Sequence, residues 1–166
     1  MGEKYKHYGA WAGILFFMAL LFWPVLTGRA AIFKDQSYEF HYQVLEFVKA
    51  SLAKGDFPLW CPDMAFGYPI AAYPEFSLFY PLFLPIGLAF PSVDAINLIV
   101  ILHYFLIAAF TFLYARSLSF HKAGAITAGI AFAFNGFMLE RYTEIQSLGA
   151  IAWMPLVLYF VEKSIA

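Results

Sequence analysis

The chain has 166 residues, of which 63% are hydrophobic and only 13% charged, and its formal net charge is −1. A soluble domain of this size cannot bury so much apolar surface, because surface grows too fast relative to volume in a small protein, so lipid must solvate much of the chain. The charge balance excludes a basic surface for nucleic acid. The single cysteine excludes an internal disulfide and a Cys-rich metal site.

The composition predicts an all-α membrane protein that forms one unit over residues 1–166. Four segments match the ~20 apolar residues that cross ~30 Å of hydrocarbon. These predicted spans are residues 8–27, 95–115, 123–139 and 148–161. A cleaved signal peptide is the alternative for the first span, since two lysines precede it. Its apolar core is longer than such peptides have, and Arg29 stands where small residues should lead to cleavage, which favours a retained span.

The third span carries small residues at four-residue spacing, which lets helices approach closely. They are Ala125, Gly129 and Ala133. The pair Asn135-Gly136 should break or kink this helix near its outer end.

A fifth apolar run, residues 76–90, contains Pro81 and Pro85, and each proline removes a backbone donor in a setting where unmet backbone groups are expensive. If this run does not cross, one side of the membrane carries net +3 and the other net −4. The short turn between the second and third spans is then basic and cytoplasmic, as the positive-inside rule requires. We therefore expect a cytoplasmic amino terminus and one long outer loop, residues 28–94, in which the Pro-rich run is re-entrant or interfacial.

The outer loop begins with an amphipathic helix, predicted over residues 38–54. Its apolar positions recur at helical spacing; they are Phe40, Val44, Phe47, Val48 and Leu52. Ser37 is the expected N-cap, and Gly55 should end the helix. A helix of this kind would lie in the membrane surface. The Pro- and aromatic-rich stretch that follows predicts a rigid, non-helical path, and a loop this long is more often functional than a tether.

The chain from Phe33 onward resembles, over nearly its whole length, the N-terminal part of the YfhO-like membrane proteins, and three stretches carry the resemblance. They are "KDQSYEF", "AKGDFPLWCPDMAFGYPIAAYPEFSLFYP" and "AGIAFAFNGFMLERYTEIQSLGAIAWMPLVLYFVEK". Cys61 and Glu75 depart from the pattern, which has Asn and Gln at these positions. The family pattern extends over many more spans, so the resemblance implies an N-terminal fragment, or a chain whose remaining membrane helices lie elsewhere.

The resemblance implies a relative of the GT-C glycosyltransferases, which take sugars from polyprenyl-phosphate carriers at the outer membrane face. These enzymes place an acidic residue just after the first span, and Asp35 occupies that position. As catalytic base it would take the proton of the acceptor hydroxyl. Arg141 would hold the leaving phosphate through a bidentate contact, with Lys34 as second choice. The alternative for Asp35 is a loop carboxylate that caps a helix or pairs with Lys34.

Further residues of the outer side complete the expected substrate site. Glu75 is a second acid of the site or a solvated loop residue, and Glu144 joins Arg141 in the last outer loop. Trp60 and Tyr68 would stack on sugar rings, or serve as part of an interfacial aromatic belt. No Asp-x-Asp pair is present, so the chemistry allows a divalent metal without indicating one, and no other cofactor is indicated.

The expected function is that of a membrane glycosyltransferase of GT-C type, or its N-terminal module, in the plasma membrane with its site on the outer face. Its partners would be the lipid bilayer, a lipid-linked sugar donor and a glycan or lipid acceptor. A transporter or flippase fragment is one alternative, which the scarcity of ionisable groups inside the predicted spans opposes. A non-catalytic membrane subunit is the other.

Overall fold

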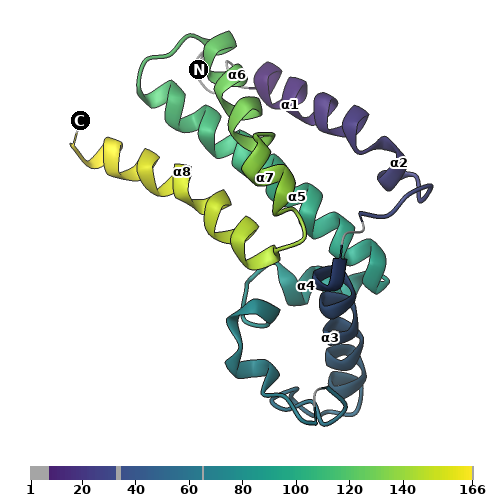
Figure 1. The fold of residues 1–166 in the computed structure, drawn as a ribbon. Helices are drawn as coiled ribbons and strands as arrows, with labels where there is room; N and C mark the ends of the chain where they lie inside the picture. The colour runs from purple at the N-terminus through teal and green to yellow at the C-terminus, as the bar shows by residue number, and fades with distance from the viewer. Residues whose placement is uncertain (1–7, 33–34, 65, 166) are drawn as a thin grey trace. The chain divides into compact units, whose positions relative to one another are not determined.

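The computed structural model describes residues 8–32, 35–64 and 66–165, with the backbone alone for residues 8, 10 and 35–39. Every named element in these ranges is a helix, which confirms the all-helical fold class (Figure 1). The backbone otherwise pairs in a strand-like manner at one isolated bridge, between Cys61 and Tyr68.

In the described part of the chain, three helical stretches are long and apolar enough to cross a membrane. They are α5 (Ser92–Ser117), the stretch Lys122–Glu140 that comprises α6 (Lys122–Ala133) and α7 (Gly136–Glu140), and α8 (Ile145–Ile165). By length and composition, the chain is a membrane protein.

The first apolar segment is shorter than predicted for a single helix. α1 (Tyr8–Leu21) ends before Phe22, and a single further turn, α2 (Trp23–Leu26), follows with Pro24 in its first turn. A proline cannot continue the hydrogen-bond ladder of the preceding helix, although it fits the first turn of a new one. The apolar part of α1, Trp11–Leu21, is therefore below the length of the three candidate spans, and the crossing at residues 8–27 stays a prediction.

The chain folds as two compact units. Unit 1 comprises Met1–Ala30, Ile101–Tyr142 and Ser147–Ala166, and unit 2 comprises Ala31–Val100 and Thr143–Gln146. The long helix α5 contributes residues 92–100 to unit 2 and residues 101–117 to unit 1.

In unit 1, α5 is the helix against which the others pack. In α5, 61% of the most apolar 18-residue segment is buried. The corresponding share is 22% in the stretch Lys122–Glu140 and 28% in α8, so these two leave most of their apolar surface for lipid. The ring of Trp11 in α1 lies edge-on to Phe112, with ring centroids 5.8 Å apart. On α8, Trp153 packs against Phe110 at 5.5 Å between centroids.

The predicted small-residue face of α6 is confirmed. Ala125, Gly129 and Ala133 are all buried. A Cβ built on Gly129 would lie 2.5 Å from the carbonyl oxygen of Ala108 in α5, so glycine is needed for this close approach.

The predicted break at Asn135 is also confirmed. α6 ends at Ala133, and the Asn135 side chain accepts a hydrogen bond from the backbone N–H of Met138 at 3.0 Å, which caps α7. The Tyr104 hydroxyl of α5 donates to the carbonyl of Met138 at 2.9 Å, and this bond holds α7 against α5.

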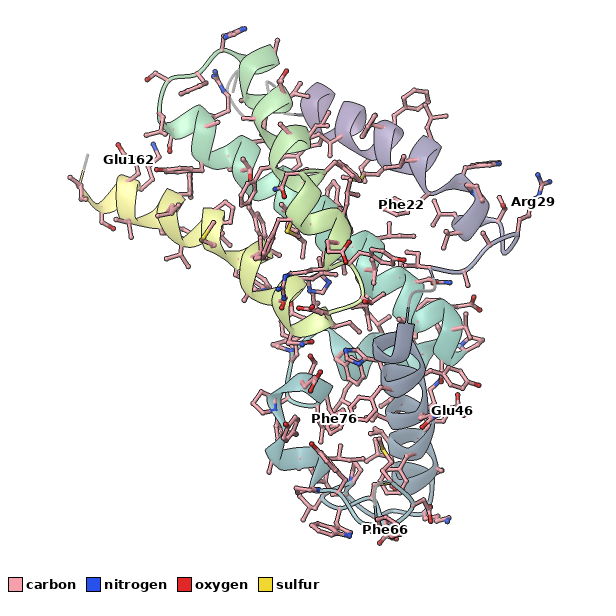
Figure 2. The ribbon with its side chains drawn as sticks, viewed as in Figure 1. Phe22, Arg29, Glu46, Phe66, Phe76 and Glu162 are labelled. Carbon is pink, nitrogen blue, oxygen red and sulfur yellow. The ribbon has the colours of Figure 1, made fainter. Side chains whose placement is uncertain are left out.

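Unit 2 is organised around α3 (Asp35–Ala53), whose apolar face contacts two clusters of buried side chains. The helix-side cluster joins α3 to α4, α5 and the start of α8; it comprises Leu45, Phe83, Ala95, Ile96, Ile99 and Ile145. The loop-side cluster joins α3 to the Pro-rich stretch; it comprises Val44, Val48, Cys61, Ile70, Phe76 and Leu78. Figure 2 shows Phe76 on the side of α3 that faces this loop, and Glu46 on the other side.

The predicted apolar face of α3 is confirmed, but its start is not. The three half-buried positions of that face, Phe40, Phe47 and Leu52, pack against the loop-side cluster. The helix begins at Asp35, so the assignment of Ser37 as N-cap is wrong. An acidic residue in the first turn suits the positive end of the helix dipole, which is a physical reason for the earlier start. Gly55 lies just past the end with φ +82°, as expected of a left-handed stop.

Polar contacts tie α3 to the start of α5. The Lys49 Nζ donates to the carbonyl of Phe90 at 2.7 Å and to the Ser92 Oγ at 2.9 Å. The Ser92 hydroxyl in turn donates to the Glu46 carboxylate. The backbone N–H of Ile32 donates to the Asn97 Oδ1 at 3.0 Å, so the segment before α3 is held to α5 as well.

The run over residues 76–90 forms turns and one short helix. After the 3₁₀ turn Pro74–Phe76, Ser77 has a left-handed backbone with φ 55°, and α4 (Phe83–Ala89) has seven residues. Seven residues rise about 10 Å, which is far less than the hydrocarbon thickness. The helix of this run is thus too short to cross alone, and its interfacial position stays a prediction.

We expect Gly129→Ala to destabilise the protein by about 1–3 kcal/mol, because the added Cβ would push α6 away from the Ala108 carbonyl oxygen. The measurement is the free energy of unfolding in detergent micelles. Gly13→Ala in α1 is the matched control, since a Cβ there meets nothing within 4 Å, and it should be neutral or stabilise by up to ~1 kcal/mol. Equal effects of the two substitutions would contradict close packing of α6 on α5.

Candidate functional site

A hydrogen-bonded turn shapes the loop of unit 2. Cys61 and Tyr68 exchange two backbone hydrogen bonds, each of 2.8 Å, and the N–H of Gly67 donates to the carbonyl of Met64 at 2.7 Å inside the turn. Residues that face each other across such a pair point to the same side, and their neighbours point to the other. Cys61 is accordingly buried and Tyr68 packs on the loop-side cluster, whereas Trp60 is 55% exposed.

Tyr68, Tyr73 and Glu75 form the candidate site. The rings of the two tyrosines meet edge to face, with centroids 5.2 Å apart, and their hydroxyls share a hydrogen bond that raises the pKa of Tyr68. Burial and the nearby charge of the Glu75 carboxylate act on that pKa in the same direction.

Buried aromatic packing holds these groups in place. Phe76 contacts both Tyr68 and Tyr73, with centroids 5.6 Å and 5.8 Å away. On its other side Phe76 packs on Phe40 of α3, with centroids 4.7 Å apart. The rings of Tyr68 and Tyr73 are therefore held on a packed aromatic base, while Tyr73 remains 43% exposed and Glu75 is exposed.

Trp60 and Phe66 lie on the outer side of the turn. A Cβ on Gly67 would be 2.5 Å from the Trp60 Cζ2, so the glycine backbone, with φ +111°, lies directly on the indole ring. Phe66 is fully exposed at the tip of the loop (Figure 2). Its φ is +64°, a conformation that costs an aromatic residue roughly 1–2 kcal/mol. A sugar ring stacked on Trp60 would therefore contact a different face of the loop from a sugar that contacts Tyr68.

The predicted site residues fall into three groups. Trp60, Tyr68, Glu75 and Glu144 all belong to unit 2, and of these the structure brings Tyr68 and Glu75 together. Asp35 is the first residue of α3, with its side chain outside the described part, and Lys34 lies outside the described residues altogether.

Arg141 belongs to unit 1, at the end of α7. Its guanidinium carbon lies 5.0 Å from the centre of the Phe137 ring, in the same helix. The predicted pairing of Asp35 with Arg141 joins residues of the two units and stays a prediction.

Two residues of unit 2, Tyr73 and His41, were not predicted from the sequence. Tyr73 precedes Pro74, and a proline favours an extended backbone at the residue before it, which was the one available signal. The backbone of Tyr73 is extended, with φ −102° and ψ 111°. His41 lies three residues before Val44 and four before Leu45, so its position on the buried face of α3 could have been read from the helical period.

His41 is 2% exposed, and neither ring nitrogen has a hydrogen-bond partner among the described residues. Burial lowers the pKa of His41 to about 4. The imidazole inside unit 2 is therefore neutral at physiological pH.

In the part of the chain that the structure describes, no group of three or more His, Cys, Asp or Glu side chains could hold a metal ion. No protein-family model matches the chain, and no characterised protein or solved structure is detectably similar to it.

Stability should fall as the pH drops from 6.5 to 4, in part because of His41. The unfolded chain binds the proton near pH 6.5 and the folded chain near pH 4. Between these values the unfolded state holds more protons, so acid favours unfolding, by about 3 kcal/mol at pH 4. The measurement is the free energy of unfolding at pH 7 and pH 4.5 for wild type and His41→Leu. A pH dependence as steep in the variant as in wild type would show that His41 is not its source.

Proposed function

We propose that the protein is a membrane glycosyltransferase of GT-C type, or the N-terminal module of one, and that unit 2 holds the sugar group of the donor. The sequence resemblance to YfhO-like proteins supports the class, and three apolar helices agree with a donor carried on a membrane lipid. The observation that carries the proposal is the cluster of Tyr68, Tyr73 and Glu75 on a rigid base.

This cluster suits the chemistry of a sugar. Each sugar hydroxyl both donates and accepts, and the cluster offers a carboxylate that accepts and phenol hydroxyls that do either. The exposed ring of Tyr73 offers an apolar surface for the C–H face of a pyranose. Aromatic packing through Phe76 fixes the groups before binding, so little ordering has to occur when the sugar arrives.

Transfer itself is assigned to Asp35, which the resemblance identifies, and to Arg141, whose guanidinium suits a phosphate. The oxygen of the acceptor hydroxyl bonds to the anomeric carbon of the sugar, with inversion, while Asp35 accepts the proton of that hydroxyl. The bond from that carbon to the phosphate oxygen breaks, and the carrier phosphate leaves with the electron pair. Arg141 binds the leaving phosphate, and Lys34 is the second choice for that role. A divalent metal is compatible with this chemistry, and none is assigned.

The proposal includes a topology. Four spans cross the plasma membrane, the first formed by α1 and α2, and the amino terminus is cytoplasmic. Unit 2 lies on the outer face, with α3 and α4 along the membrane interface. The basic turn between α5 and α6, which holds Arg116 and Lys122, supports this orientation.

Labelling from outside the cell tests the topology. Cys61 is buried and unsuited to labelling, so the experiment uses Cys61→Ala as background. In this background, a cysteine introduced as Asp63→Cys, at an exposed position of unit 2, should react with an impermeant maleimide in intact cells. One introduced as Ser119→Cys, at an exposed position between α5 and α6, should react only after permeabilisation. The reverse pattern would invert the orientation and remove the outer site.

Asp35→Asn should reduce sugar transfer ~10²–10⁴-fold, because Asn keeps the shape of Asp but cannot accept a proton at neutral pH. Asp56→Asn is the matched control: it makes the same change at an exposed acid of unit 2 outside the candidate site and should be nearly silent. The measurement is transfer of labelled sugar from a polyprenyl-phosphate donor in membranes that contain each variant at equal abundance.

Full activity of Asp35→Asn would reduce Asp35 to a structural residue. Absence of transfer by wild type from every such donor would remove the enzyme proposal and favour a transporter or non-catalytic subunit.

A further inference from the structure

His41 stands out in unit 2 because a buried polar side chain is normally paired. Leaving a buried donor or acceptor unmet costs about 1–3 kcal/mol, and His41 has two such atoms, Nδ1 and Nε2. The residues next in line on the same face of α3 are apolar: Leu45 in the helix-side cluster and Val44 in the loop-side cluster. The imidazole therefore lies where the two clusters meet α3, one helical turn before both.

A second unmet polar atom belongs to the same part of unit 2. The side-chain oxygen of Gln146 is buried and has no hydrogen-bond partner among the described residues. Gln146 follows Ile145, which packs in the helix-side cluster together with Leu45. One apolar cluster is thus adjoined by two side chains with open hydrogen-bonding positions, on α3 and at the start of α8.

We propose that unit 2 binds uncharged hydroxyl groups in its interior, where one ring nitrogen of His41 donates to one hydroxyl, the other ring nitrogen accepts from a second, and the Gln146 oxygen accepts a further hydrogen bond. A neutral imidazole offers one donor and one acceptor, and an amide oxygen adds an acceptor. A hydroxyl is the group that meets both kinds of position without bringing charge into an apolar interior.

Two sources can supply this group. One is a hydroxyl of the donor sugar, in which case His41 and Gln146 belong to the sugar-binding set and the inference rests on the proposed function. The other is a buried water molecule, which commonly satisfies polar side chains of this kind. The chemistry at His41 is the same for both.

The test is NMR of the full protein in lipid nanodiscs with 15N-labelled histidine, where the His41 signals are assigned by their loss in His41→Gln. A sugar hydroxyl should shift these signals when a polyprenyl-phosphate sugar is added, while a retained water should show cross-relaxation to the His41 ring before any addition. Either result supports the inference and identifies the source. Absence of both, with His41 in one neutral form without a hydrogen bond, overturns it.

Variants separate this inference from the proposed function. If the group is a sugar hydroxyl, His41→Leu should weaken donor binding about tenfold, the effect of one or two lost neutral hydrogen bonds. His41→Gln, which keeps a donor and an acceptor, should lose less. If His41→Leu binds the donor as tightly as wild type does, the group is not a sugar hydroxyl. If transfer also depends on Asp35, the enzyme proposal stays intact. Absence of transfer in wild type removes the enzyme proposal, and the water measurement still decides the inference.

Discussion

The requirement that every backbone polar group find a partner governs how this chain can fold in and beside a membrane. Long apolar helices meet it internally, which is how α5, α6 and α8 are built. The Pro-rich stretch after α3 cannot meet it that way, since its prolines lack donors. It instead folds against the apolar face of α3. Backbone hydrogen bonds between Cys61 and Tyr68 pair some of its polar groups, and Phe76 is buried between the turn and α3.

That arrangement also holds together the candidate site of unit 2. Phe76 binds the turn to α3 through Phe40 and supports the tyrosines from below. The rings of Tyr68 and Tyr73 are consequently held relative to each other, although they stand on an irregular segment. The exposed carboxylate of Glu75 lies near enough to act on the pKa of Tyr68. A rigid set of polar groups on a loop is a common basis for binding, because the scaffold sets the geometry in advance.

The sequence predicts the parts of this fold that depend on composition and period. The apolar helices, the face of α3 and the break at Asn135 follow from length, helical spacing and residue type. The start of α3 at Asp35 was missed because several polar residues there can each begin a helix. The end of α1 before Pro24 was missed because the apolar run continues through the proline. The association of Tyr68 with Tyr73 could not be predicted, since it depends on long-range packing of a stretch without any period. His41 was overlooked because a histidine on an apolar face carries no signal of whether it is paired.

The central claim is that the cluster of Tyr68, Tyr73 and Glu75 contacts the sugar. The direct measurement is NMR of ring-labelled tyrosine in lipid nanodiscs, with assignment by Tyr68→Phe and Tyr73→Phe, during addition of a polyprenyl-phosphate sugar and, as control, the polyprenyl phosphate alone. The account predicts that the Tyr68 and Tyr73 signals shift with the sugar-bearing lipid and not with the bare carrier. Unchanged signals for both tyrosines at saturating donor, or equal shifts with the bare carrier, would contradict it.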